Sequence, residues 1–197
     1  DSTASVSDLC GVNYAVVITD SVGCSVTVDV LILSPQPLSA SAIITPITCN
    51  SSCDGAITLI AQGGTGNPAF TWTPPPPVGQ NTPSISQLCA DIWTVVITDV
   101  NGCDTTYSYP LFDPPELTVQ LSTTSNDCFG DCAGTATATI SGGTGSYSIE
   151  WSTSGGGFIN NGDTAIIGLC AGDYVVTVTD SSGCSVSTPF NIGQGVA

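Results

Sequence analysis

The sequence predicts an all-β chain of tandem, disulfide-stapled β-sandwich repeats of about 80 residues each. Two observations carry this prediction. The first is a motif in which Leu-Cys leads into an alternating strand and then into Asp-x-x-Gly-Cys; it occurs three times, at residues 9–24, 88–103 and 169–184. The second is the alternation itself, because apolar residues at every other position have the period of a half-buried strand.

The spacing between equivalent residues sets the repeat boundaries. The step from Cys49 to Cys128 equals the step from Cys10 to Cys89, whereas the step from Cys89 to Cys170 is longer, so two residues are inserted in the later repeat. Sandwiches of this size have marginal cores, and cross-links help them most. The expected organisation is the C-terminal half of a repeat at 1–36, a complete β-sandwich repeat at 37–115 and a second complete one at 116–197.

Each copy of the motif predicts a β-hairpin. In the third copy Tyr174, Val176 and Val178 point to one face of the first strand. That strand runs into Asp180-x-x-Gly183, where the aspartate side chain can bond the turn backbone and glycine tolerates a positive φ. A cysteine then opens the second strand.

Further features favour an immunoglobulin-like sandwich of about seven strands per repeat. A tryptophan follows each Cys-x-x-x-Cys motif at a constant spacing and precedes another cysteine, as in the immunoglobulin core. Leu169-x-x-Gly-x-Tyr174 resembles the tyrosine corner before the sixth strand, whereas Trp93 replaces the tyrosine in the second copy and leaves that hydrogen bond open. Gly-Gly-Thr-Gly, at 63–66 and 142–145, predicts a tight turn between strands, since neither the lysine nor the helix of a phosphate-binding loop follows it.

The composition excludes two classes of partner. The chain has 197 residues with no Lys, Arg or His, and its 16 Asp and Glu give a formal net charge of −16. Because no basic patch can neutralise phosphate, we expect no nucleic-acid binding and no docking on anionic lipid. No apolar run approaches the ~20 residues of a spanning helix, so membrane insertion is not expected either.

The cysteines indicate where the protein works. Ten cysteines at fixed spacings, with no histidine to complete a metal site, favour disulfides and an oxidising compartment. Cys-x-x-x-Cys, at 49–53 and 128–132, is less typical of zinc ligands than Cys-x-x-Cys. The sequence shows no signal peptide and begins within a repeat, so we expect an excerpt of a longer, processed polypeptide.

The motifs, taken in order, resemble a known repeat family. The order is Cys-x-x-x-Cys-x-Gly, Gly-Gly-Thr-Gly, Phe70-x-Trp72 and the Leu-Cys hairpin motif, and it spans essentially all 197 residues. It is similar to the SprB-type repeat of giant cell-surface gliding adhesins of the Bacteroidota. The resemblance implies type IX secretion, surface filaments of tandem repeats and attachment of moving cells, without an active site. The hairpin is also similar to the polycystic-kidney-disease domain, a second, related family.

The expected function is therefore that of a stalk segment in a surface adhesin, not that of an enzyme. The expected partners are neighbouring repeats of the same chain, together with extracellular polysaccharide or other surfaces. The alternative is a carbohydrate-binding module, either dependent on calcium or independent of it. No cofactor is expected; calcium is the candidate, because Asp127 with Asp131, or Asp163 near Asn160 and Asn161, offers the oxygen ligands that it prefers.

The cystine pattern follows from an immunoglobulin-like topology, in which the entries to the second and sixth strands share one end of the sandwich. The two cysteines of each hairpin motif flank an extended strand and stand too far apart to bond. For Cys49, a local bond to Cys53 is the rival of a bond to Cys103. The predicted pairs are Cys53–Cys89, Cys132–Cys170, Cys49–Cys103 and Cys128–Cys184, with Cys10 and Cys24 bonded to residues upstream of Asp1.

The resemblance to Bacteroidota surface proteins also implies O-glycosylation, at Asp followed by Ser or Thr and then by an apolar residue or Thr. The pattern occurs four times, and the copy in the first hairpin turn is expected to be the best exposed. The candidate acceptors are Ser2, Ser21, Thr105 and Thr164.

Overall fold

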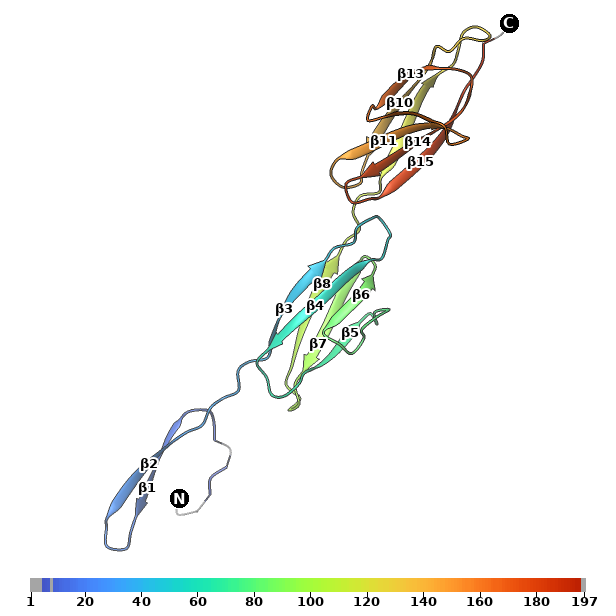
Figure 1. Ribbon diagram of the computed structural model, residues 1–197. Coiled ribbons are helices and arrows are strands. Elements are labelled where there is room, and N and C mark those ends of the chain that lie inside the picture. Colours follow the sequence, from blue (N-terminus) through green and yellow to red (C-terminus); the bar gives the residue numbers. More distant parts are fainter. Residues whose placement is uncertain (1–4, 8, 196–197) are drawn as a thin grey trace.

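The computed structural model describes residues 5–7 and 9–195, and every regular element in these residues is a β-strand. Figure 1 shows an elongated molecule in which a hairpin and two sandwiches follow one another end to end. The strands are β1 (Asn13–Thr19), β2 (Ser25–Leu31), β3 (Ser39–Thr45), β4 (Gly55–Gln62), β5 (Ala69–Thr73), β6 (Ser84–Leu88), β7 (Asp91–Thr98), β8 (Asp104–Leu111), β9 (Thr118–Thr124), β10 (Gly134–Ser141), β11 (Tyr147–Thr153), β12 (Phe158–Asn161), β13 (Ala165–Leu169), β14 (Gly172–Asp180) and β15 (Ser185–Ile192).

The sheet topology confirms the predicted fold class, an all-β chain of immunoglobulin-like sandwiches. In the first sandwich, β3 to β8, one sheet has the order β3-β4-β6 and the other β5-β7-β8. In the second sandwich, β9 to β15, the orders are β13-β10-β9 and β12-β11-β14-β15. All the strand pairs are antiparallel. The first two strands of each sandwich thus pair in one sheet and the last hairpin lies in the other, as in an immunoglobulin domain.

The first sandwich has six strands rather than about seven. The second sandwich adds β12 at the free edge of β11. In the first sandwich β5 is followed by Pro74 to Pro77, and proline has no N–H to donate to a neighbouring strand. The run of prolines therefore ends the sheet at β5.

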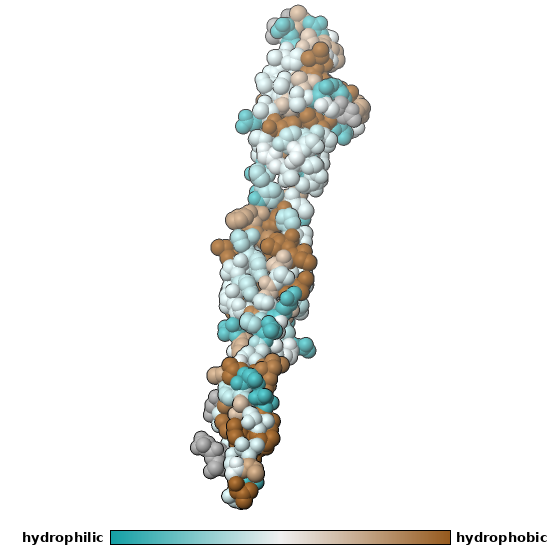
Figure 2. Space-filling view, turned by 90° about the vertical axis from the view of Figure 1, so that its left-hand side faces the viewer, coloured by the Kyte–Doolittle hydropathy of each residue, from teal (hydrophilic) through white to brown (hydrophobic). Residues whose placement is uncertain are grey.

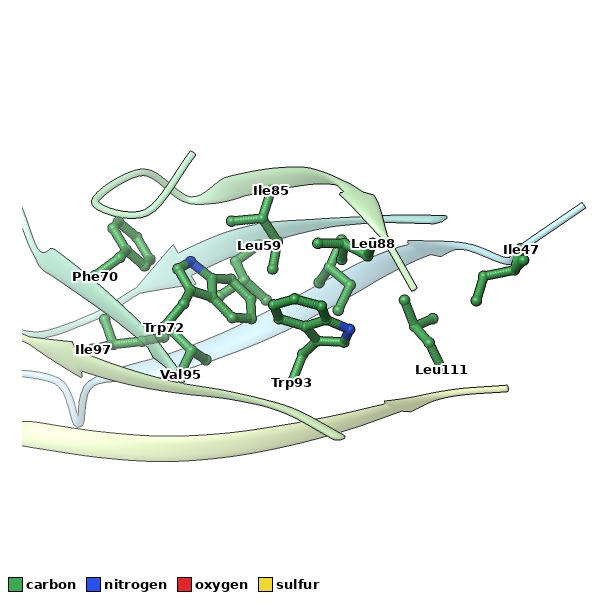
Figure 3. Close-up of a cluster of buried hydrophobic side chains, with 11 residues drawn as sticks. Ile47, Leu59, Phe70, Trp72, Ile85, Leu88, Trp93, Val95, Ile97 and Leu111 are labelled. Atoms are coloured by element: carbon green, nitrogen blue, oxygen red, sulfur yellow. The ribbon is translucent and has the colours of Figure 1, made fainter. Parts of the chain in front are cut away.

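Each sandwich is closed around a buried tryptophan. Trp72 and Trp151 are each 1% exposed, and each donates its indole N–H to a backbone carbonyl of the following loop, Thr82 at 3.1 Å and Asp163 at 2.9 Å. Figure 3 shows Trp72 beside Trp93 between the two sheets of the first sandwich. The first core consists of Ile47, Ile57, Leu59, Phe70, Trp72, Ile85, Leu88, Trp93, Val95, Ile97 and Leu111.

The N-terminal hairpin has the same sequence pattern but no facing sheet among the described residues. Val16 in β1 is 48% exposed, whereas its equivalents Val95 and Val176 are 0% exposed in the two sandwiches. Figure 2 shows brown, apolar residues gathered at the lower end of the molecule, where this hairpin lies. The burial of the motif's apolar face therefore depends on the facing sheet, not on the hairpin itself.

Within the described residues, no helix is long and apolar enough to cross a membrane.

Candidate functional site: the junction between the two sandwiches

Each sandwich has an internal cystine at the end where its second strand and the first strand of its last hairpin begin, which are β4 and β7 in one sandwich and β10 and β14 in the other. The pairs are Cys53–Cys89 and Cys132–Cys170, each with 3.8 Å between α-carbons, and they are the pairs that the sequence predicts. Cys89, Cys132 and Cys170 are exposed, because each cysteine precedes its strand instead of lying within it. The cystines therefore close one end of the sandwich and do not pack inside the core as the immunoglobulin pattern suggested.

The remaining cystine joins the two sandwiches. Cys49 bonds to Cys184, with 5.6 Å between α-carbons and a sequence separation of 135. The expected pairs Cys49–Cys103 and Cys128–Cys184 are wrong, since Cys103 and Cys128 carry free thiols. The reason is geometric: the eight residues of β7 separate the two ends of the first sandwich by ~26 Å, so its hairpin cysteine cannot reach its own Cys-x-x-x-Cys segment.

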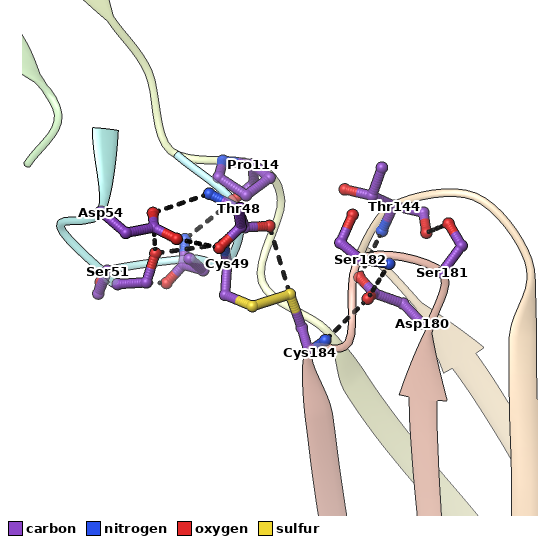
Figure 4. The surroundings of a disulfide bond; sticks show 12 residues. Thr48, Cys49, Ser51, Asp54, Pro114, Thr144, Asp180, Ser181, Ser182 and Cys184 are labelled. Atoms are coloured by element: carbon purple, nitrogen blue, oxygen red, sulfur yellow. Dashed lines mark hydrogen bonds between the residues drawn. A yellow bond between two sulfur atoms is a disulfide. The ribbon is translucent and has the colours of Figure 1, made fainter. Parts of the chain in front are cut away.

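The first sandwich holds the connecting segment through its cysteine loop, residues 49–53. The Asn50 side-chain amide donates to the carbonyl of Pro114 at 3.1 Å, and the Ser51 N–H donates to the Asp113 carboxylate at 3.2 Å. The loop thus fixes the chain just where it leaves β8 for the second sandwich. Figure 4 shows the loop and the disulfide on the same side of Pro114.

The cysteine loop is itself held by a carboxylate. Asp54 accepts hydrogen bonds from the N–H and the hydroxyl of Thr48, and from the hydroxyl of Ser52 at 2.6 Å. These bonds, Ser52 first, stabilise the charged form and lower the pKa of Asp54 from 3.8 to about 2. The carboxylate therefore fixes both flanks of Cys49 at any pH above about 4.

The second sandwich presents Cys184 through its hairpin turn, residues 180–184. One oxygen of the Asp180 carboxylate accepts the N–H groups of Ser182 and Cys184, both at 2.9 Å, and the other accepts the N–H of Thr144 at 2.8 Å. Burial disfavours the charged form, but these backbone donors outweigh it and hold the pKa of Asp180 below its ordinary value. One side chain thus ties the hairpin turn to the Gly-Gly-Thr-Gly turn of the same sandwich.

The Gly-Gly-Thr-Gly turn completes the junction from the other side. The Gly143 N–H donates to the Pro115 carbonyl at 2.9 Å, so the second sandwich also holds the connecting segment. Gly143 has a φ of +66°, and a β-carbon there would lie 2.9 Å from the Asp180 carboxylate. A side chain at this position would displace the aspartate that positions Cys184.

A hollow lies beside the intersandwich cystine, between the cysteine loop and the hairpin turn. Its lining includes Cys49, Asn50, Glu116, Leu117 and Cys184. The parts that meet here are a covalent bond, backbone amides and carboxylates bound to those amides.

The tyrosine corner is formed in both sandwiches, by different residues. The Tyr174 hydroxyl donates to the Cys170 carbonyl at 2.9 Å. In the first sandwich the indole N–H of Trp93 donates to the equivalent Cys89 carbonyl at 3.2 Å. Trp93 therefore replaces the tyrosine without loss of the hydrogen bond that the sequence left open, and each corner fastens the cysteine before the last hairpin of its sandwich.

The candidate glycosylation acceptors have different environments. Ser21 in the β1–β2 turn and Thr164 before β13 are exposed, whereas Thr105 in β8 is half-buried. Ser2 lies outside the described residues. All four remain proposals.

The oxygen-rich clusters considered for calcium are open and separate. Asp127 and Asp131 are exposed and flank Cys128 in the second cysteine loop. Asp163 accepts a hydrogen bond from the Asn160 side chain at 3.1 Å, and Asn161 ends β12. Among the described residues, no three acidic or thiol side chains lie close enough together to hold a metal ion.

The intersandwich cystine is the feature that the sequence analysis missed. A signal for it was present, because equivalents of both Cys49 and Cys184 recur in every copy of the motifs. When the two cysteines lie at opposite ends of their own sandwich, each can instead bond to the equivalent partner cysteine of a neighbouring repeat.

The fold and the junction define a tandem-repeat protein of immunoglobulin-like sandwiches, stapled within and between its units. In the sequence comparison the SprB repeat model matches residues 41–76 and 121–156. The chain carries two SprB-type repeats, one in each sandwich. No curated protein matches the chain.

Solved structures with a similar fold are distant in sequence. Three N-terminal domains of the Highly Immunogenic Outer Capsid protein of bacteriophage RB49 are 17% identical, with a TM-score of 0.46, over 80% of this chain and 59% of that chain. The eight N-terminal immunoglobulin domains of Down Syndrome Cell Adhesion Molecule are 12% identical, with a TM-score of 0.49, over 94% of this chain and 28% of that chain. The chain thus spans less than two thirds of either structure.

Proposed function

We propose that the chain is a stalk segment of a secreted, filamentous adhesin at a bacterial surface, where it serves attachment and gliding motility. The two SprB-type repeats and the immunoglobulin-like fold fit an extracellular surface protein with a structural or adhesive role. Export through type IX secretion and an origin in the Bacteroidota are the finer terms of the proposal, and the family resemblance supports them. Neighbouring repeats are the partners of the stalk segment, and extracellular polysaccharide or other surfaces are the partners of the adhesin as a whole.

The observation that carries the proposal is the Cys49–Cys184 bond between consecutive sandwiches. A binding module does not require a covalent bond to the neighbouring domain, whereas a stalk under tension is strengthened by such a bond. The hydrogen bonds of Asn50 and Gly143 to the connecting segment support the same role, because they hold that segment from both sides.

The domain boundaries proposed for the stalk are those of the repeat spacing, 37–115 and 116–197, after a half-repeat at 1–36. Each complete unit has its own core and its own internal cystine. These two features support units that fold separately and are joined end to end.

The charge of the chain also suits a stalk. With a formal net charge of −16 and no cationic side chain, parallel stalks repel one another over a Debye length of ~10 Å at 0.1 M salt. High salt or millimolar calcium is therefore expected to bring stalks together, and small-angle scattering at low and high ionic strength tests this.

An in-frame deletion of residues 37–197 in the bacterium that makes the protein tests the stalk. The expected result is a shorter surface filament in electron micrographs, with reduced attachment and gliding and unchanged export. A filament of unchanged length, or cells that attach and glide normally, would overturn the proposal.

The alternative, a carbohydrate-binding module, is tested by calorimetry on residues 1–197 with a polysaccharide panel, with and without calcium. Heat that saturates with one polysaccharide would favour that function over the stalk. The stalk predicts no such heat in either condition.

A further inference from the structure

The cysteines without a partner have the same spacing as those that are bonded. Cys10, Cys24, Cys103 and Cys128 are all exposed and unbonded in the described chain. We propose that Cys103 and Cys128 are half-cystines, each built to bond to a flanking repeat of the same type, so that every junction of the filament is covalently closed.

The repeat spacing identifies their partners. Cys128 is the equivalent of Cys49 in the second repeat, and Cys103 is the equivalent of Cys184 in the first. Because Cys49 bonds to the hairpin cysteine of the next sandwich, the same step leaves Cys128 for the hairpin cysteine of a following repeat. By the same spacing, Cys103 is left to bond to the first cysteine of the Cys-x-x-x-Cys motif in a preceding repeat.

The hairpin turn of the first sandwich already has the bonded geometry. The Asp99 carboxylate accepts the N–H of Cys103 at 2.9 Å and that of Thr65 at 3.0 Å, just as Asp180 holds Cys184 and Thr144. The Gly64 N–H donates to the Gln36 carbonyl at 2.8 Å, the counterpart of the bond from Gly143 to the second connecting segment. Cys103 is thus held in place before any partner arrives.

The place for the partner is also open. The hollow at the bonded junction has Cys184 and Leu117 on one side and the cysteine loop, with Cys49, on the other. A matching hollow before the first sandwich is lined by Cys103 and by Leu38, the equivalent of Leu117. No cysteine loop contributes to its lining, and the loop of a preceding repeat would supply that second wall.

Charge gives the bond a physical purpose. The two repeats at a junction are both acidic, and the chain has no cation with which to form an ion pair across it. The hydrogen bonds to the connecting segment are few and exposed, so water can replace them. A disulfide resists a separating force that these contacts alone do not.

Formation of this disulfide from two thiols requires an oxidant, and an ordinary disulfide can serve as one. The thiols of Cys128 and its partner together lose two protons and two electrons as the sulfur–sulfur bond forms. Oxidised glutathione accepts them and is converted to two molecules of glutathione by thiol–disulfide exchange.

The first test uses the chain as it is. Residues 1–197 are equilibrated in a glutathione buffer, blocked with iodoacetamide, cleaved with an Asp-specific protease and mapped by mass spectrometry. We expect a Cys49–Cys184 peptide, with alkylated Cys103 and Cys128. A Cys49–Cys103 or a Cys128–Cys184 peptide would overturn the inference.

The second test supplies the missing partner. A second copy of residues 117–197 is placed after Ala197, and the extended chain is oxidised and mapped in the same way. We expect Cys128 linked to the hairpin cysteine of the added copy, and Cys128→Ser should leave that added cysteine alkylated. Cys132→Ser is the matched control, because it removes an internal cystine and leaves the new junction bond intact.

An alkylated hairpin cysteine in the added copy, beside an intact Cys132–Cys170 peptide that reports folding, would refute the inference. This outcome is separate from a failure of the proposed function, since peptide mapping reports the bond whether or not the chain serves gliding.

Discussion

The two cysteine loops occupy equivalent places in the two sandwiches, yet different residues hold them. In the first, the exposed Asp54 carboxylate binds Thr48 and Ser52 on either side of Cys49. In the second, the buried Asn126 side chain accepts the N–H groups of Ala133 and Gly134, at 2.6 and 2.8 Å. The sandwich fold and the position of the loop's first cysteine are kept, while the side chains that fix the loop are exchanged.

Electrostatics explains the exchange. Asp127 and Asp131 stand where the first loop has Thr48 and Ser52, and Ala133 stands where it has Asp54. A third carboxylate between two others would be repelled, because no cation is present in the chain to compensate. A neutral amide from the opposite side of the loop avoids that cost. The two loops thus present their first cysteine at the same position through different contacts.

The largest effect that bears on this comparison is expected from the core tryptophans. Trp72→Ala and Trp151→Ala should each destabilise the sandwich that contains them by about 3–5 kcal/mol, through the cavity left by a fully buried side chain. Scanning calorimetry should show one transition lowered and the other kept. Equal lowering of both transitions by either variant would mean that the sandwiches unfold as one unit, and the comparison between them would fail.

The internal cystines should come next. Replacing both cysteines of Cys53–Cys89 or of Cys132–Cys170 by serine opens loops of 36 and 38 residues and should cost roughly 3–4 kcal/mol in the chain-entropy model. Denaturation in urea measures the loss. The Cys49→Ser, Cys184→Ser double variant is the control, because its bond lies between the sandwiches; a similar loss inside one sandwich would contradict the division of roles.

Much of this architecture was predictable from the sequence, because it depends on local chemistry. Alternation indicated the strands, Asp180-x-x-Gly183 indicated a hairpin turn, and the topology of the sandwich indicated the Cys53–Cys89 pair. Each of these conclusions needs only the residues of one repeat.

The intersandwich cystine was not predictable in the same way, because it depends on how two repeats meet. To predict that the first sandwich lacks a strand, one would have to know that Pro74 to Pro77 ends the sheet. To predict the corner at Trp93, one would have to know that its indole N–H reaches the Cys89 carbonyl. Both depend on packing. The indole N–H of Trp93 takes the place of a tyrosine hydroxyl as donor, and the prolines end the pairing of strands at the edge of the sheet.

A smaller effect is expected at the tyrosine corner. Tyr174→Phe removes a part-buried hydrogen bond to the Cys170 carbonyl and should cost the second sandwich about 1 kcal/mol in urea denaturation. Tyr147→Phe is the matched control, because its hydroxyl donates to the Gly142 carbonyl at an exposed position, where water can replace it. A loss as large for Tyr147 as for Tyr174 would show that the corner has no special role.

The last prediction separates the two loops by pH. Asp54 has its pKa lowered from 3.8 to about 2, so it adds stability to the first sandwich above about pH 4 and loses that contribution as the pH falls toward 2. Asn126, its counterpart in the second sandwich, does not titrate. Asp99 and Asp180, whose pKa values are also lowered by backbone donors that outweigh burial, weaken both sandwiches alike in acid.

The first sandwich should therefore lose more stability than the second between pH 5 and pH 2.5. In a Trp151→Phe background both remaining tryptophans, Trp72 and Trp93, report the first sandwich alone, and their fluorescence in urea measures its unfolding. Asp54→Asn in that background should lower stability at pH 5 and flatten the acid loss, because the titrating group is gone. An acid loss that is the same with and without Asp54 would show that the carboxylate does not hold the loop, and the contrast with Asn126 would disappear.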